Sequence, residues 1–156
     1  MSLKLNDKLP YFILKNQYNK EVNSKNFYGK KLIVFFYPKD DTPGCTIETN
    51  EFNKLLSKFK KLGCEVYGIS KDSLKSHDKF KEKYKIKFDL LADEELKVLK
   101  KYKVWKKKKF MGREFMGVVR TTYLIDKRGQ ILKVWNNVKA KDHAKEVLET
   151  LQQITK

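Results

Sequence analysis

The fold is decided by the stretch Leu32-Ile33-Val34-Phe35-Phe36-Tyr37-Pro38-Lys39-Asp40-Asp41-Thr42-Pro43-Gly44-Cys45. Its first six residues are aliphatic or aromatic, and such a short apolar run predicts a strand buried on both faces. Beyond it, apolar residues recur with helical spacing at Phe52, Leu55, Leu56, Phe59 and Leu62, which predicts an amphipathic helix. Pro43 and Gly44 mark the turn between the two elements. We therefore expect Cys45 in or beside the first helical turn, where unpaired backbone N–H groups and the helix dipole favour an anion such as a thiolate.

Strands and helices alternate along the rest of the chain. We expect an early strand at 11–14, a turn at 16–19, the central strand at 31–37, the helix from Cys45 to about Leu62 with Gly63 as its stop, and a strand at 65–70. A helix at 73–85, a short strand at 88–91, a helix at 94–102 and a basic loop that contains Lys106 to Lys109 follow. Strands at 121–126 and 130–135 are joined by a hairpin signal, and a helix at about 141–154 closes the chain. This order predicts a single α/β domain, 1–156, with a mixed sheet flanked by helices.

The residues Pro38, Thr42 and Cys45 fit the pattern Pro-x-x-x-Thr-x-x-Cys, the signature of the peroxiredoxins. The wider sequence resembles the Q-type branch of that family, which includes proteins similar to the bacterioferritin comigratory protein. The resemblance covers nearly the whole chain, and it includes, in order, Tyr67-Gly68-Ile69-Ser70, Ser76-His77, Phe80, Leu90-Leu91-Ala92-Asp93 and Arg120-Thr121-Thr122-Tyr123-Leu124-Ile125-Asp126. It implies a thioredoxin-like fold with an N-terminal extension of the peroxiredoxin type.

The same resemblance implies an activity and its residues. The activity is a thiol-dependent peroxidase that reduces hydrogen peroxide or alkyl hydroperoxides through a sulfenic acid at Cys45, without metal, haem or flavin. It assigns catalytic roles to Cys45, Thr42 and Arg120, and substrate-binding roles to Pro38, Pro43, Gly44 and Glu48. Thioredoxin, glutaredoxin or glutathione is the implied reductant, and the expected assembly is a monomer or a weak homodimer.

Elementary chemistry supports the need for several residues around the cysteine. A free thiol is only a few per cent ionised at neutral pH, so complete ionisation raises the reactive fraction about thirtyfold, worth about 2 kcal/mol of barrier. Larger acceleration needs donors around the departing peroxide oxygen, where negative charge develops. The Thr42 hydroxyl, the Arg120 guanidinium and the N–H groups at the helix start are suited to this role.

Glu48 has two interpretations. A carboxylate that faced the sulfur one helical turn away would disfavour the thiolate, so we expect Glu48 to orient Arg120, as its family counterpart is thought to do. The alternative is an ordinary acidic residue in a first helical turn, where the helix dipole favours it. The sequence leaves both open.

The charge of the chain is its most conspicuous bulk property. The 36 Lys and Arg residues against 19 Asp and Glu give a net charge of +17, and only Arg113, Arg120 and Arg128 are arginines. Clustered cations bind nucleic acids, but no zinc-finger spacing, aromatic RNA-binding motif or helix-turn-helix pattern accompanies these lysines. We therefore expect solvated lysine-rich surfaces and no specific nucleic-acid partner.

Targeting signals and metal motifs are missing from the sequence. No apolar run approaches the roughly 20 residues of a membrane span, and the segment 1–7 lacks the apolar core of a secretion signal, so we expect a cytoplasmic protein with no membrane partner. The two histidines, His77 and His143, have no second histidine or cysteine at ligand spacing, so a zinc site is not expected. His77 is expected in helix packing or capping. Trp105 and Met116 flank the basic loop, either as an apolar collar for a peroxide or dimer contact, or as side chains that pin the loop.

Other classes of protein remain as alternatives. A thioredoxin-type oxidoreductase needs Cys-x-x-Cys, and here the residue three after Cys45 is Glu48. A glutathione transferase or a thiol-dependent binding module does not require Thr42 with Arg120, and a nucleic-acid protein would bind without Cys45.

The second cysteine decides how the oxidised enzyme is recycled. Many Q-type members carry a resolving cysteine five residues after the first, and this chain has Asn50 there. The other thiol, Cys64, follows the same helix, whose rise of 1.5 Å per residue separates the two α-carbons by about 25 Å. A disulfide requires at most about 7 Å. We therefore expect a one-cysteine cycle with an external thiol, and a buried structural role for Cys64.

Overall fold

The computed structural model describes residues 3–5 and 7–155. The predicted domain, 1–156, therefore extends beyond the described residues at both ends. Of the segment 1–7, in which no secretion signal was predicted, residues 1–2 and 6 lie outside the described residues. The strands are β1 (Ile13–Asn16), β2 (Glu21–Asn23), β3 (Lys31–Phe36), β4 (Cys64–Ser70), β5 (Leu90–Ala92), β6 (Trp105–Phe110), β7 (Arg113–Val118), β8 (Thr121–Ile125) and β9 (Ile131–Trp135). The helices are the 3₁₀ helix η1 (Ser24–Phe27) and α1 (Pro43–Lys61), α2 (Leu74–Tyr84), α3 (Lys97–Lys101) and α4 (His143–Thr155).

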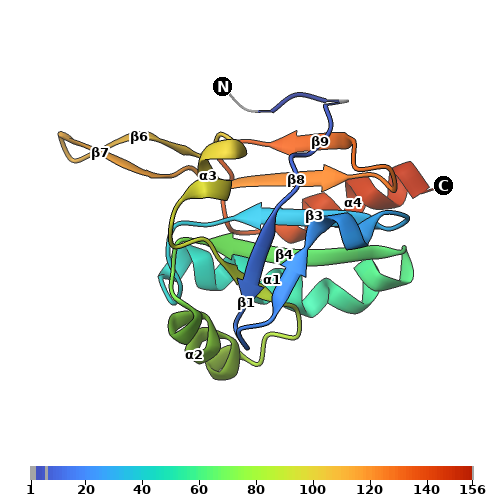
Figure 1. Cartoon of the computed structure of the whole chain (residues 1–156), viewed down its shortest axis with the longest axis horizontal. Helices are drawn as coiled ribbons and strands as arrows, with labels where there is room; N and C mark the ends of the chain where they lie inside the picture. The colour runs from blue at the N-terminus through green and yellow to red at the C-terminus, as the bar shows by residue number, and fades with distance from the viewer. Residues whose placement is uncertain (1–2, 6, 156) are drawn as a thin grey trace.

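Seven strands form one mixed sheet in the order β2-β1-β5-β4-β3-β8-β9 (Figure 1). The central strands β3, β4 and β5 are parallel, and β8 and β9 continue the sheet in antiparallel fashion. β1 joins β5, and β2 joins β1, both antiparallel, so the N-terminal segment extends the sheet at the β5 side. This arrangement confirms the predicted mixed sheet flanked by helices.

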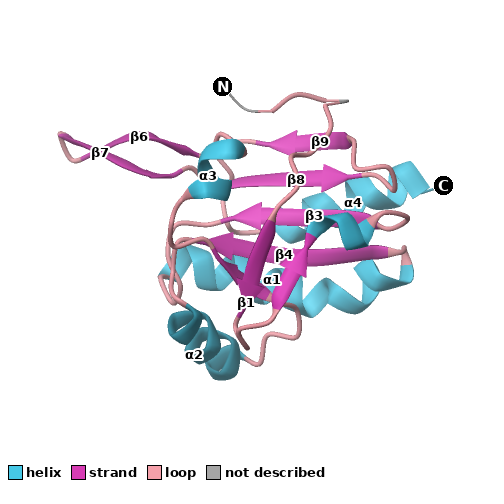
Figure 2. Cartoon of the chain, viewed as in Figure 1, coloured by secondary structure: helices cyan, strands magenta, loops and turns pink. Residues whose placement is uncertain are grey.

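Strand β3 is buried on both faces, as its apolar run predicts. Ile33, Phe35 and Tyr37 lie in one core with residues of α1, α2 and α4, including Phe52, Phe59, Phe80, Val147 and Leu151. Leu32, Val34 and Phe36 lie in a second core on the opposite face, with the N-terminal segment and α3, including Leu9, Phe12, Val98 and Leu99. The alternation follows from the two-residue period of a strand. The helical layers are visible on the two sides of the sheet in Figure 2.

Helix α1 begins and ends where its sequence predicts. Thr42 is the extended N-cap residue and Pro43 occupies the first helical turn, where a missing N–H costs no hydrogen bond. At the other end, Gly63 has φ +73°, and its N–H donates to the Lys60 carbonyl. The helix therefore runs directly from the turn after β3 into the start of β4.

Two sequence predictions are wrong. The basic loop is a two-stranded antiparallel hairpin, β6 and β7, in which Lys106 to Lys109 lie within β6. Met111 and Gly112 both have positive φ at its tip, and this conformation matches the twist of a two-residue hairpin turn. The predicted helix at 94–102 is reduced to the five residues of α3, because Leu96 adopts φ +65° and breaks the helix on its N-terminal side. β2 and η1 were not predicted.

None of the helices in the described part of the chain is both long enough and apolar enough to cross a lipid bilayer.

Candidate active site

The junction between β3 and α1 carries Cys45. The Tyr37 N–H donates to the Ile69 carbonyl at 3.1 Å, which ties the end of β3 to β4 before the chain turns. Cys45 is the third residue of α1, and its side chain is 1% exposed. The first helical bond joins the Thr46 N–H to the Thr42 carbonyl at 2.9 Å, and within the described residues no side chain caps this end of α1. The N–H groups of the first turn thus remain for an anion.

Arg120 is distant from Cys45 in the sequence but lies beside it in the fold. It lies between β7 and β8, and its Nη2 is 3.5 Å from Cys45 Sγ. Its Nη1 donates to Glu48 Oε1 at 2.8 Å. A planar guanidinium has donors in fixed directions, so one residue holds the sulfur and the carboxylate together.

Gly44 makes room for this guanidinium. A β-carbon at position 44 would lie 3.0 Å from Arg120 Nη2 and 4.0 Å from the Ala140 Cβ. The first distance is shorter than an ordinary van der Waals contact. The role that the structure gives Gly44 is therefore clearance for Arg120, one turn before Glu48.

Glu48 is a buried carboxyl group on α1. Burial raises its pKa from 4.5 to about 7, although the charge of Arg120 acts in the opposite direction. Its Oε1 is bound by Arg120, and its Oε2 has no hydrogen-bond partner among the described residues. Of the two interpretations of Glu48, the geometry supports the one in which it orients Arg120, because an acidic residue held only by the helix dipole would face solvent.

Thr42, Pro38 and Pro43 lie on the segment that leads from β3 to Cys45. The Thr42 hydroxyl donates to the Lys39 carbonyl at 2.8 Å, so the lone pairs of its oxygen are the part left for a substrate. Pro38 is half-buried two residues after the end of β3, and Pro43 is exposed at the start of α1. All three lie on the loop and helix start that carry Cys45.

Lys108 is a neighbour of this cluster that the sequence did not reveal. Its ammonium group donates to the Val118 carbonyl at 2.9 Å, two residues before Arg120. Burial lowers the pKa of Lys108, and the charge of Arg120 lowers it further, while Cys45 acts in the opposite direction. The hairpin therefore places a second cation near the thiol.

A buried polar network anchors the loop that precedes Cys45. Asp40 accepts hydrogen bonds from the Tyr37 hydroxyl at 2.6 Å and from the Ser76 hydroxyl at 2.8 Å. His77 Nδ1 lies 2.7 Å from Asp40 Oδ2, and its Nε2 lies 3.0 Å from the Leu91 carbonyl oxygen. Both ring nitrogens of His77 thus have a polar partner. The loop is thereby fastened to α2 and β5.

Asp72 completes the network. It accepts from the Asp40 N–H at 2.8 Å and from the Ser70 hydroxyl at 2.7 Å. Oxygen and nitrogen atoms of Asp40, Asp72 and His77 lie within 4.8 Å of one another, as metal ligands do. These atoms already accept or donate hydrogen bonds inside the protein, so the cluster is explained as a positioning network for the loop. The sequence offered only the match at Ser76-His77. His77 lies in a helix, as predicted, but its ring nitrogens contact Asp40 and the Leu91 carbonyl, and the N-cap of α2 is Ser73.

In the described part of the chain, the remaining candidates form no hydrogen bond with Cys45. Cys64 is buried at the start of β4, and burial raises its pKa to about 12. His143 is also buried, and burial lowers the pKa of its imidazole. Its Nε2 lies 2.8 Å from the Thr122 hydroxyl oxygen. Trp105 lies in β6 opposite Val118, and Met116 lies in β7 opposite Lys107. Both are therefore strand residues and do not flank a loop, contrary to the prediction.

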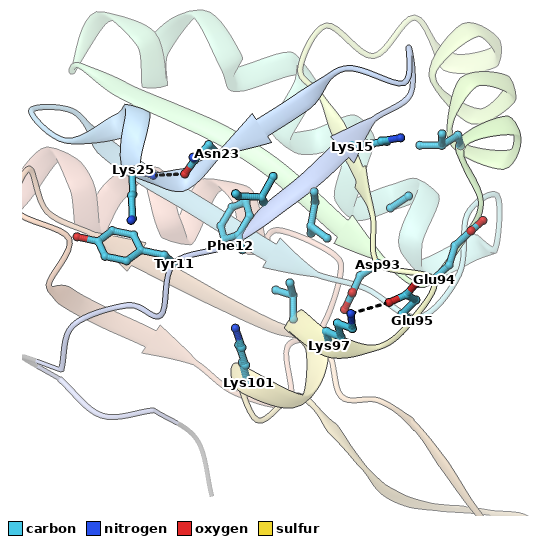
Figure 3. A pocket seen from close by; sticks show the side chains of 15 residues that line it. Tyr11, Phe12, Lys15, Asn23, Lys25, Asp93, Glu94, Glu95, Lys97 and Lys101 are labelled. Atoms are coloured by element: carbon cyan, nitrogen blue, oxygen red, sulfur yellow. Dashed lines mark hydrogen bonds and ion pairs between the residues drawn. The ribbon is translucent and has the colours of Figure 1, made fainter.

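A broad groove elsewhere on the molecule shares no residue with this cluster. It has a volume of about 700 Å³ and lies between β1 and α3. In Figure 3, Lys25, Lys97 and Lys101 surround it together with Asp93 and Glu95. Lys97 pairs with Glu95 at 2.9 Å, so part of its charge is already compensated.

Comparison with known proteins identifies close relatives over the whole chain. Residues 5–134 match the AhpC/TSA family. Peroxiredoxin Bcp from Bacillus subtilis is 42% identical over 155 residues, and the match covers 99% of each chain.

Solved structures agree with this relationship. A cysteine mutant of PrxQ from Xylella fastidiosa superimposes with a TM-score of 0.95 at 32% identity, covering 100% of this chain and 99% of the other. The bacterioferritin comigratory protein from Xanthomonas campestris, studied for its alkyl peroxide reduction activity, superimposes with a TM-score of 0.88 at 36% identity, covering 93% and 92%.

Proposed function

Because this chain belongs to the AhpC/TSA family and is a peroxiredoxin, a thiol-dependent peroxidase, we propose that its reaction takes place at Cys45 and is assisted by Thr42 and Arg120. The observation that carries this assignment is the 3.5 Å contact between Arg120 Nη2 and Cys45 Sγ, made while Nη1 is held by Glu48. No other thiol in the described part of the chain has a guanidinium within hydrogen-bond distance.

The proposed step transfers one oxygen atom. The Cys45 thiolate attacks the terminal oxygen of a hydroperoxide, the O–O bond breaks, and an S–O bond forms. Sulfur is oxidised to a sulfenic acid and the peroxide is reduced to water or an alcohol, which takes up the proton that the thiol released. Negative charge develops on the departing oxygen, and the Arg120 guanidinium and the N–H groups of the first turn of α1 are donors suited to it. In this proposal the Thr42 oxygen accepts a hydrogen bond from the hydroperoxide O–H and so orients the substrate.

Gly44, Glu48, Pro38 and Pro43 have supporting roles in this proposal. Gly44 leaves space for the guanidinium, and Glu48 fixes its plane. The two prolines bracket the loop and restrict its backbone. We propose hydrogen peroxide and alkyl hydroperoxides as substrates, in line with the alkyl peroxide reduction activity of the Xanthomonas campestris relative.

Recycling is proposed to use an external thiol. Cys64 lies beyond the far end of α1, and a thiol whose pKa is about 12 is almost entirely protonated and therefore a poor nucleophile. A reductant thiol attacks the sulfenic acid, releases water and forms a mixed disulfide, and a second thiol restores Cys45. Thioredoxin, glutaredoxin and glutathione are the candidate reductants. Two free thiols fit a reducing compartment such as the cytoplasm, and we propose a monomer or a weak homodimer as the working form.

Peroxide consumption measured separately with each of the three reductants tests the proposal. The parent protein is expected to turn over, and Cys45→Ser to lose turnover while it keeps the fold, because a hydroxyl is a poor nucleophile at neutral pH. A conformational check by circular dichroism separates lost chemistry from lost structure. Turnover retained in Cys45→Ser above a control without enzyme would contradict the assignment.

A further inference from the structure

The β6–β7 hairpin is the part of the molecule that the peroxidase reaction does not account for. Its two strands pair only with each other and are not part of the seven-stranded sheet. In Figure 1 the hairpin projects from the body at the end of the sheet where β3 terminates and the Cys45 loop begins. A two-stranded ribbon without a core is only marginally stable in water, so its long exposed form requires an explanation.

The tip of the hairpin is apolar and exposed. Phe110 is 66% and Met111 is 88% exposed, although residues of these types are usually buried. Phe115 and Met116 follow on the returning strand at 46% and 51% exposure. Exposed apolar side chains at the end of a projecting element mark an interaction surface.

The shaft of the hairpin is basic. Residues 105–118 contain five cations, Lys106 to Lys109 and Arg113, against one acid, Glu114, which pairs with Lys107 at 2.9 Å. Lys108 is turned toward the Val118 carbonyl. Among the described residues, Lys106, Lys109 and Arg113 form no ion pair, and they lie behind or beside the apolar tip.

Protection of strand edges does not explain this distribution. Lysines on an exposed edge prevent pairing with other strands, and this would account for the shaft. It would not place phenylalanine and methionine at the most exposed position. A second copy of the chain is also disfavoured as the occupant, because two shafts of the same charge repel each other.

We infer that the hairpin is a docking element for an anionic lipid surface, with Phe110 and Met111 entering the headgroup region and the lysines contacting lipid phosphates. An apolar tip with cations behind it matches both layers of such a surface, and long lysine side chains reach back to the phosphates. The net charge of +17 adds a general attraction. Peripheral contact of this kind needs no membrane-spanning helix. It therefore replaces the prediction of no membrane partner, although the observation behind that prediction, the lack of an apolar run long enough to span a membrane, still holds.

Nucleic acid is the competing polyanion. Single-stranded nucleic acid is bound by aromatic rings that stack on bases, together with cations along the backbone. Here the most exposed side chain is Met111, which has no ring, and methionine at a tip suits a lipid environment better.

Because Arg120 follows β7 by two residues, a docked hairpin would place the catalytic end of the sheet next to the lipid surface.

Cosedimentation of the full chain with vesicles tests the inference. Vesicles of phosphatidylglycerol mixed with phosphatidylcholine are compared with vesicles of phosphatidylcholine alone. We expect the double variant Phe110→Ser, Met111→Ser to bind the anionic vesicles at least about tenfold more weakly. The double variant Lys106→Gln, Lys109→Gln should lose about fivefold per lysine.

Matched controls separate this element from bulk charge. Tyr28 directly follows η1 and is 71% exposed, and Lys75 and Lys79 are exposed on α2. Tyr28→Ser should leave vesicle binding unchanged, and Lys75→Gln with Lys79→Gln should reduce it less than the hairpin pair does. Urea unfolding of every variant verifies that the fold persists.

Insertion is measured directly with Phe110→Trp. Its fluorescence should be quenched by brominated lipid in anionic vesicles, whereas the same tryptophan at Tyr28 should not be. Equal binding of the tip variant and the parent would overturn the inference and leave only general electrostatic attraction. Tip-dependent binding to single-stranded RNA without binding to vesicles would assign the hairpin to nucleic acid instead.

Discussion

Replacing Glu48 by glutamine should make the protein more stable at neutral and alkaline pH and less active. Glu48 is fully buried, and burial raises its pKa from 4.5 to about 7 in spite of the Arg120 charge. The native state therefore holds the Glu48 proton more tightly than the unfolded chain does. The stabilisation that this proton provides is complete below pH 4.5 and is lost as the pH rises through about 7.

The size of the effect follows from the same shift. At about 1.4 kcal/mol per pH unit, a pKa raised from 4.5 to about 7 corresponds to about 3 kcal/mol of unfolding free energy. Glutamine has no proton to lose, so this part of the pH dependence should vanish in Glu48→Gln. The Arg120 guanidinium then faces a neutral acceptor and is held less firmly, so peroxide turnover should fall.

Urea unfolding at a series of pH values measures this directly. The stability of Glu48→Gln relative to the parent should rise by about 3 kcal/mol between pH 4.5 and pH values above 7. Glu149→Gln, at an exposed position on α4, is the matched control and should show no such trend. A difference between Glu48→Gln and the parent that stays constant across the window would refute the reasoning, because folding would then leave the pKa of Glu48 unchanged.

Three further variants test the rest of the site. Arg120→Lys keeps the charge but loses the planar fork, so the second-order rate with peroxide should fall at least about tenfold, and a parental rate in stopped-flow measurements would remove Arg120 from the site. Asp40→Asn removes the carboxylate that binds His77. The free energy of unfolding measured in urea should fall by about 2 kcal/mol or more, and turnover should be slower. If both values stay unchanged, the loop needs no anchor. Cys64→Ser should keep turnover, and mass spectrometry of the parent after one equivalent of peroxide should find a trapped sulfenic acid at Cys45; a dominant Cys45–Cys64 disulfide would reverse this prediction.

The elements around the cysteine could be predicted because several local signals agree there. The apolar run of β3, the turn residues before α1 and the helical spacing after it all specify the same strand-turn-helix unit. Gly63 ends α1 in the conformation that its position predicts. The pairing of Arg120 with Glu48 was one of two open interpretations, since the sequence separates them by 72 residues and only the fold brings them together.

The hairpin could not be predicted from its hydrophobic pattern. Four consecutive lysines have no two-residue alternation of apolar and polar side chains, so they resemble a solvated loop. The usable signal was Gly112, which follows Met111 between two short runs that contain Phe110 and Phe115. The helix predicted at 94–102 was too long because the composition of this segment favours a helix throughout. In the structure Leu96 adopts a left-handed conformation, so α3 begins only at Lys97.

The loop anchor was out of reach of sequence reasoning for a further reason. Asp40 and Asp72 are ordinary turn residues by position, and neither has a spacing that indicates a partner. Their roles depend on the distance between the β3–α1 and β4–α2 connections, which lie at the same edge of the sheet because β3 and β4 are parallel. Side chains at the ends of parallel strands meet in this way whatever their separation along the chain.

The charge balance at Arg120 bears on the reaction that we propose at Cys45, because a buried carboxyl group lies next to that thiol. Arg120 carries one positive charge and contacts two groups that can each be negative, Glu48 and Cys45. With a thiolate at Cys45, a protonated Glu48 leaves the cluster neutral, whereas an ionised Glu48 leaves an excess negative charge in a buried site. Since the pKa of Glu48 is about 7, this carboxyl group exchanges its proton within the range of neutral pH. Oxidation of the thiolate to a neutral sulfenic acid removes one negative charge, which favours ionisation of Glu48 and a stronger hold on Arg120. The carboxyl group is thus suited to compensate the charge that the sulfur loses during the reaction, and a permanently charged or permanently neutral residue at position 48 would not be.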